Sequence, residues 1–236
     1  MTKTIATFAA VLGYTVLATN AQAEEISRFY LDLGAGASIS KGNEATRNAS
    51  IFANRGKAKH EAGRSFSAAL GYWVCDDWRA DLSFNYLPSW RVKESRVMST
   101  LSLPYYYQGN ISSLATMLNL SYDFNQFAIN NITPYVTAGV GITSNKTSNT
   151  DVFVNNELSE HMLNNTSHNF SWKIGLGASY QLNDRVALDL GYRLAALGKA
   201  KTKLSYDSVT LLADSTHNLF KNLYSNQIVL TARLSF

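Results

Sequence analysis

The chain has few of the residues that cross-link or interrupt a fold. Its 236 residues include one cysteine and three prolines, and only 16% of them are charged. A single cysteine excludes an internal disulfide framework and a zinc site built from several thiolates. Beyond residue 23 the sequence also lacks the long apolar run that a membrane-spanning helix needs. Any role in a membrane must therefore come from the pattern of its apolar residues.

The first 23 residues have the three-part pattern of an export signal. Lys3 is followed by an apolar stretch over residues 5–18 and then by Ala21-Gln22-Ala23, the small-x-small pattern of a cleavage site. A membrane anchor is the weaker interpretation because polar and small residues interrupt a stretch that is too short to cross a bilayer. The sequence predicts a cleaved signal peptide over residues 1–23 and one domain over residues 24–236.

Apolar residues recur with a period of two in the rest of the chain. In residues 186–194, Val, Leu, Leu, Tyr and Leu alternate with Ala, Asp, Gly and Arg, so the two sets lie on opposite faces of a strand. The same alternation predicts eight strands, at about residues 28–39, 65–74, 78–87, 111–124, 133–143, 169–182, 185–194 and 224–236. Each segment has about the length that a tilted strand needs to cross the hydrocarbon layer.

The connections between these strands alternate between long and short. Residues 40–64, 88–110, 144–168 and 195–223 form long connections, whereas residues 75–77, 125–132 and 183–184 form short ones. A soluble sandwich has no reason to gather all long loops at one end, but outer-membrane barrels have short periplasmic turns and long external loops. We therefore expect an all-β fold, a closed eight-stranded antiparallel transmembrane barrel with four long extracellular loops, in the bacterial outer membrane.

The second face of the strands has a nearly balanced set of charges. These residues are expected to form a barrel-interior charge network: Arg28, Asp32, Arg79, Asp81, Asp123, Lys173, Asp189, Arg193 and Arg233. Eight strands enclose an interior that side chains about fill. The sequence therefore predicts a paired, hydrogen-bonded interior that conducts little or nothing.

Three segments give the chain a family resemblance. They are residues 133–141 (TPYVTAGVG), residues 188–193 (LDLGYR) and the alternating last strand that ends in Phe236. With them the chain resembles the eight-stranded outer-membrane proteins of the opacity-protein and OmpA-transmembrane-domain type. The resemblance implies an adhesin or surface antigen, and the C-terminal aromatic residue resembles the signal that the barrel-assembly machinery recognises.

The predicted outer loops are basic. Residues 41–64 contain six basic and two acidic residues, and the second loop adds three basic residues against one acidic residue. The residues expected to contact a ligand are Arg55, Lys57, Lys59, Arg91 and Lys93. Such a surface favours anionic partners such as a sulfated glycan or an acidic patch on a host surface or serum protein. Equally, the charges could meet outer-membrane lipid and lipopolysaccharide. We expect a monomer and no nucleic-acid partner.

Three apolar segments lie in the predicted loops, at residues 103–107, 152–154 and 209–212. Exposed apolar patches often mark interaction sites. Alternatively, the strands continue above the bilayer and bury these residues against one another. The partial alternation of residues 201–211 favours the second interpretation, with a binding tip above the extended strands.

The sequence predicts no catalysis, cofactor or metal site. All four histidines fall in predicted outer loops, and the adjacent residues Ser159-Glu160-His161 rarely converge into a catalytic geometry. The histidine spacings define no local metal site. Three alternatives to an adhesin stay open: a structural barrel, a narrow channel, and a lipid A-modifying enzyme.

Overall fold

The computed structural model describes residues 28–44, 58–60, 62–97, 104–155, 157–203 and 216–236. Nearly all of these residues belong to strands. The elements are β1 (Phe29–Glu44), β2 (Ala58–His60), β3 (Ala62–Trp73), β4 (Trp78–Val97), β5 (Pro104–Asp123), the 3-10 helix η1 (Asn125–Phe127), β6 (Ile132–Val154), β7 (Glu157–Met162), β8 (Asn165–Asn183), β9 (Val186–Lys203) and β10 (Thr216–Ser235). Within the described ranges, no helix is both long and apolar enough to cross a membrane.

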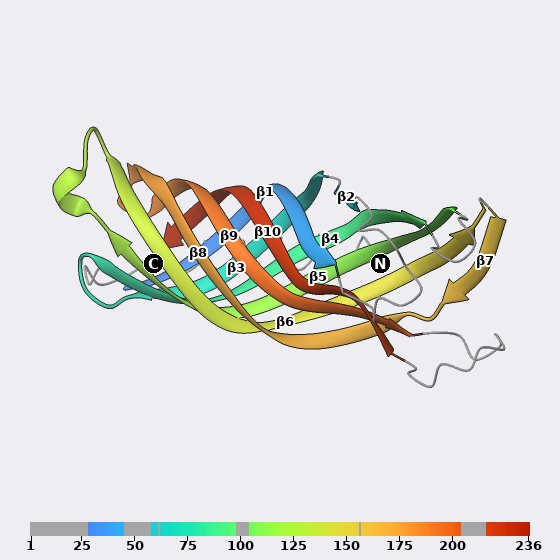
Figure 1. Ribbon diagram of the computed structural model, residues 1–236. Helices are drawn as coiled ribbons and strands as arrows, with labels where there is room; N and C mark the ends of the chain where they lie inside the picture. Colours follow the sequence, from blue (N-terminus) through green and yellow to red (C-terminus); the bar gives the residue numbers. More distant parts are fainter. Residues whose placement is uncertain (1–27, 45–57, 61, 98–103, 156, 204–215) are drawn as a thin grey trace, which may run out of the picture.

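Eight of the strands close into a barrel, which confirms the predicted fold. The antiparallel pairings run from β4 through β3, β1, β10, β9, β8 and β6 to β5, and β5 pairs with β4 to complete the circle. The first and last strands are neighbours, with Asp32 opposite Arg233. The short strands β2 and β7 pair only with β4 and β6, so they extend the sheet without entering the circle. Figure 1 shows the strands lying side by side at a common tilt.

The strands extend further outward than the alternation predicted. β5 begins at Pro104, and β6 continues to Val154, with Tyr105 opposite Val154 and Tyr106 opposite Phe153. The predicted boundaries mark where the apolar lipid-facing residues end, but backbone pairing needs no apolar face and continues above them. Strand continuation is therefore confirmed for residues 104–107 and 152–154, whereas residues 209–212 lie outside the described part of the chain.

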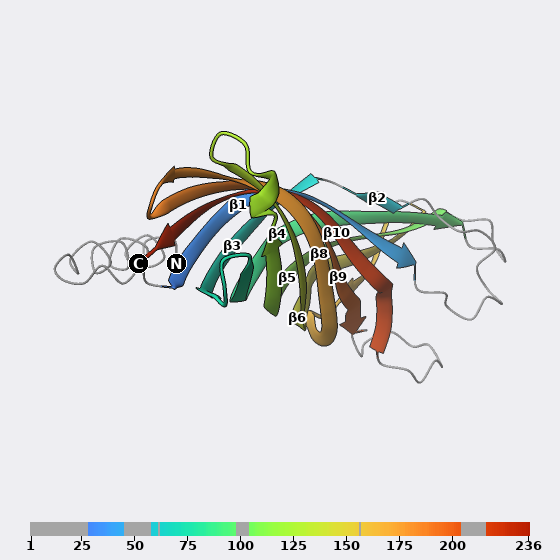
Figure 2. The same ribbon diagram turned by 90° about the vertical axis from the view of Figure 1, so that its left-hand side faces the viewer.

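The short connections gather at one end of the barrel, which faces the viewer in Figure 2. Asn130 and Asn131 have φ angles of 49° and 64°, in the left-handed region that asparagine tolerates. They close a tight turn between Ile129 and Ile132, whose backbones exchange two hydrogen bonds of 3.0 and 2.9 Å. Asn125 donates hydrogen bonds of 2.9 Å to the Asp76 carbonyl and to Asp77 Oδ1, which ties two of the turns together.

The two faces of the barrel are inverted relative to a soluble protein. Large apolar side chains point outward, among them Leu118 at 65% and Phe170 at 70% exposure. Many of the buried side chains are polar or charged. Aromatic pairs such as Trp78 with Tyr122, 5.0 Å between ring centroids, lie near the short turns. Because lipid cannot satisfy polar groups, this outer face is the one that a bilayer requires.

Candidate functional site

An ionic layer crosses the interior near the short-turn end. It consists of Asp32, Arg79, Asp123, Asp189 and Arg233, which come from β1, β4, β5, β9 and β10. Arg79 donates two hydrogen bonds of 2.6 Å to Asp123, and Arg233 Nε lies 3.2 Å from Asp32 Oδ1. Asp189 accepts a hydrogen bond from Arg233 and lies 3.9 Å from Arg79 Nη1. The layer is continuous because one carboxylate faces both guanidinium groups.

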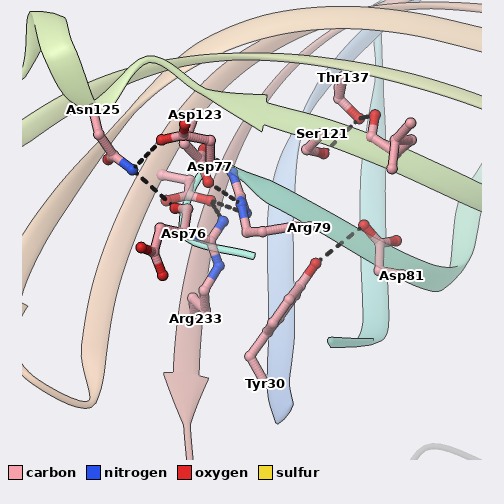
Figure 3. Close-up of polar contacts among 12 residues, drawn as sticks. Tyr30, Asp76, Asp77, Arg79, Asp81, Ser121, Asp123, Asn125, Thr137 and Arg233 are labelled. Carbon is pink, nitrogen blue, oxygen red and sulfur yellow. Dashed lines mark hydrogen bonds and ion pairs between the residues drawn. The ribbon is translucent and has the colours of Figure 1, made fainter. Parts of the chain in front are cut away.

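Aromatic rings pack against the ionic layer. Tyr30 is fully buried, its ring lies 5.9 Å from the Arg79 guanidinium and 5.2 Å from that of Arg233, and its hydroxyl donates to Asp81 at 3.5 Å. Figure 3 shows Tyr30 pointing across the interior toward Asp81. The ring passes directly over Gly71, where even a Cβ would collide with it. The missing side chain on β3 therefore makes room for the aromatic residue on β1.

The other charged residues predicted for the interior lie above or outside this layer. Lys173 is buried and its Nζ donates to Ser83 Oγ at 3.4 Å, while Arg193 donates to Thr231 at 3.4 Å. Asp81 accepts a hydrogen bond from Asn119. A cavity of about 30 Å³, room for about one water molecule, lies among these groups. Arg28 stands apart, because it is exposed just before β1 begins.

An apolar cluster that the sequence did not predict fills the interior toward the outer end. The outer apolar cluster consists of Leu87, Trp90, Ile111, Ala115, Met117, Ala195, Leu197, Ala200 and Leu223. The alternation contained a signal for it, since Met117 and Ile111 share the odd positions of β5 with the interior residues Asn119 and Asp123. Trp90 had no such signal, because the ladder between β4 and β5 shifts register between Leu87 and Trp90.

Three of the residues predicted to contact a ligand are positioned by the strands. β2 pairs with β4 so that Lys59 lies directly opposite Lys93, and the exposed residue Arg91 lies two positions before Lys93 on β4. We call Lys59, Arg91 and Lys93 the basic rim. Arg55 and Lys57 lie outside the described residues. The pairing thus gathers basic positions from two connections that are distant in the sequence.

Comparison with known proteins identifies the fold family. A family model described as the outer membrane protein beta-barrel domain matches residues 7–236. The chain belongs to this family. It is an outer-membrane barrel, and both the predicted localisation and the predicted family type are confirmed.

Individual relatives cover different parts of this outer-membrane barrel. It is 36% identical over 83 residues to the outer membrane protein PagN of Salmonella typhimurium, which covers 35% of this chain and 34% of PagN. A proposed adhesin of Rickettsia bellii is 24% identical over 148 residues, 61% of this chain and 64% of the relative. The chain thus spans about a third of PagN and just under two thirds of the Rickettsia protein. The crystal structure of Neisserial surface protein A, 18% identical, has the same fold, with a TM-score of 0.52 over 89% of this chain and 98% of that one.

One polar pair on the outer surface of the barrel has residue types that occur in catalysis. Ser144 Oγ and His168 Nδ1 are 2.8 Å apart on neighbouring strands, and His168 is exposed. A hydrolase also needs a group that orients the histidine. Among the described residues, His168 makes no hydrogen bond to a carboxylate, and no group of three or more histidine, cysteine, aspartate or glutamate residues could hold a metal ion. The pair can form hydrogen bonds to a polar ligand from either side chain.

Proposed function

We propose that this outer-membrane barrel is a surface adhesin or antigen that contacts host molecules through its outer strand ends and loops, without catalysis. The observation that carries the proposal is the basic rim. Lys59 and Lys93 occupy opposing positions of the β2–β4 pair, and Arg91 is exposed beside them. Like charges on directly opposed positions destabilise a strand pair, so this arrangement is costly unless an anion neutralises it.

The partner that this chemistry favours is anionic. A sulfated glycan or an acidic patch on a host surface or serum protein would neutralise the rim, and such attraction mainly raises the association rate. The Rickettsia relative that is described as an adhesin supports the same class of function. The buried ion pairs and the outer apolar cluster disfavour the alternative of a channel, because both fill the interior.

The proposal is tested by binding of the refolded barrel to immobilised heparin and to host cells, at low and high salt. The triple variant K59Q/R91Q/K93Q should lose about tenfold in affinity or more, and R91Q alone about two- to fivefold, because each exposed contact contributes up to about 1 kcal/mol. R28Q is the matched control, since Arg28 is also an exposed arginine but lies at the opposite end of the barrel. Binding to the wild type should weaken as salt screens the charges.

Equal binding of the triple variant and the wild type would contradict a ligand site at the basic rim. If the wild type shows no saturable binding, or a loop-deleted barrel binds as the wild type does, host contact through the outer loops is wrong. In that case the structural alternative predicts a different result, a loss of envelope integrity in a deletion strain.

A further inference from the structure

The lipid-facing surface is hollowed across β5, β6 and β8. The hollow, which we call the lipid groove, has a volume of about 430 Å³. The outward-facing residues that line it are Leu118, Leu120, Ala138, Val140, Trp172 and Ile174. Ala138 lies directly between Leu120 and Ile174 in the ladder. Because its side chain is a single methyl group between two larger ones, it forms the floor of the groove.

Polar and basic side chains lie above the groove on the same strands. Moving outward from Val140 and Trp172, the ladder places Ile142 beside Phe170, then Ser144 beside His168, and then Lys146 beside Thr166. Lys146 and His168 are exposed, and among the described residues Lys146 makes no ion pair. The surface thus changes from apolar to basic within a few residues.

The spacing between the two features matches the depth of one lipid leaflet. Lys146 is six residues beyond Val140 on β6, which corresponds to about 20 Å along a strand and about 15 Å along the membrane normal for a tilt of about 40°. The apolar band of such barrels is about 25 Å tall, so with Lys146 at the outer headgroups Val140 lies near the middle of the bilayer, and the outer part of the groove is within reach of the end of an outer-leaflet acyl chain.

We propose that this face binds one lipopolysaccharide molecule of the outer leaflet. An acyl chain of its lipid A part lies in the lipid groove, and a lipid A phosphate contacts Lys146 and His168. Ser144 shares its hydrogen bond with His168 and so holds the imidazole at the surface. The exposed residue Lys199, on the neighbouring strand β9, adds positive charge at the same end. The described acids on this part of the surface, Asp151 and Glu157, lie further out along the chain.

The proposal is tested by native mass spectrometry of the folded full-length barrel in micelles. Three probes are titrated separately: bisphosphorylated lipid A, the same lipid A without phosphates, and dipalmitoylphosphatidylglycerol. The wild type should retain one lipid A at least about fivefold more tightly than the lipid A without phosphates, because one cation near the membrane surface contributes about that factor. It should also retain lipid A more tightly than phosphatidylglycerol, which offers only one phosphate and two acyl chains. K146Q should lower lipid A affinity about fivefold for the same reason.

Filling the groove tests the acyl-chain contact. A138L should lower lipid A affinity about tenfold because its larger side chain fills the groove and keeps the acyl chain from burying its surface there, and the smaller change A138V should have a smaller effect in the same direction. The matched controls A232L and R64Q should stay within about twofold of the wild type. Ala232 is a lipid-facing alanine between leucines in the opposite half of the barrel, and Arg64 is an exposed cation on β3.

Each other outcome overturns a stated part of the proposal. If A138L and A138V, folded by their unheated electrophoretic mobility, bind lipid A as the wild type does, no acyl chain occupies the groove. If K146Q binds unchanged, or the dephosphorylated lipid A binds as tightly, the phosphate contact is wrong. Equal retention of phosphatidylglycerol would show a general anionic-lipid surface and overturn the assignment to lipopolysaccharide.

Discussion

At the scale of single residues, Asp189 is the shared anion of the ionic layer. It accepts a hydrogen bond from Arg233 and lies 3.9 Å from Arg79, and each of these guanidinium groups also has a carboxylate of its own, Asp123 for Arg79 and Asp32 for Arg233. A buried hydrogen bond between charged groups contributes more than a neutral one, because its partners have no water to replace it. Asp189 should therefore contribute more to stability than an exposed aspartate.

We expect D189N to lower the free energy of unfolding by about 2 kcal/mol, since Arg233 loses a charged hydrogen bond while each guanidinium group keeps its other carboxylate. Urea unfolding of the barrel in lipid vesicles, followed by tryptophan fluorescence, measures the change. D184N is the control because Asp184 is exposed in a short turn, and its effect should stay within about 0.5 kcal/mol. Equal stability of D189N and the wild type would contradict the shared-anion role.

At the scale of elements, the asparagines of the turn between η1 and β6 should set its stability. Asn130 and Asn131 both have left-handed backbones, a conformation that costs alanine about 1–2 kcal/mol, that asparagine tolerates, and that costs glycine almost nothing. The variant N130A/N131A should therefore lose about 2 kcal/mol of stability, whereas N130G/N131G should match the wild type. Urea unfolding measures both variants. If the alanine and glycine variants unfold alike, the backbone conformation of this turn does not limit stability.

Period-two alternation was sufficient to place the eight barrel strands but not their outer ends. Within the bilayer, one face of each strand contacts lipid and the other contacts packed interior side chains, and this difference imposes the alternation. The segment from Ser65 to Val74 could therefore be recognised directly. Above the bilayer both faces meet water, the pattern weakens, and the extension of β6 to Val154 is set by backbone pairing alone. The register shift between Leu87 and Trp90 changes which alternate positions of β4 face inward, and the alternation in the sequence gives no sign of such a shift.

At the scale of the whole molecule, the interior has two seals in series. The ionic layer lies toward the short turns, and the outer apolar cluster lies toward the long loops. The alternation in the sequence assigned the predicted interior charges to the inner face, and Arg28, which is exposed before β1 begins, is the exception. The partners of the interior charges depend on which strands become neighbours across a closed circle, as when Arg79 on β4 reaches Asp189 on β9. That arrangement could not be predicted from sequence.

If the two layers each close the interior, substitutions in one layer alone should not make the barrel conduct ions. The wild type should give no single-channel steps in a planar bilayer, because water would have to cross both an apolar layer and a charged layer without space for a continuous file. The described cavity among the charged groups has a volume of about 30 Å³, roughly one water molecule. W90A should stay silent because the ionic layer remains closed, and R79A should stay silent because the outer apolar cluster remains closed.

The combined variant W90A/R79A should conduct, since it removes the largest side chain of one layer and a central cation of the other. A double-mutant comparison of this kind isolates the coupling between the two layers, provided that each variant still folds. Steps in W90A alone would mean that the ionic layer does not close the barrel. Steps in the wild type would contradict both seals and favour the narrow channel over the adhesin, because a conducting interior would give this barrel a function independent of its basic rim.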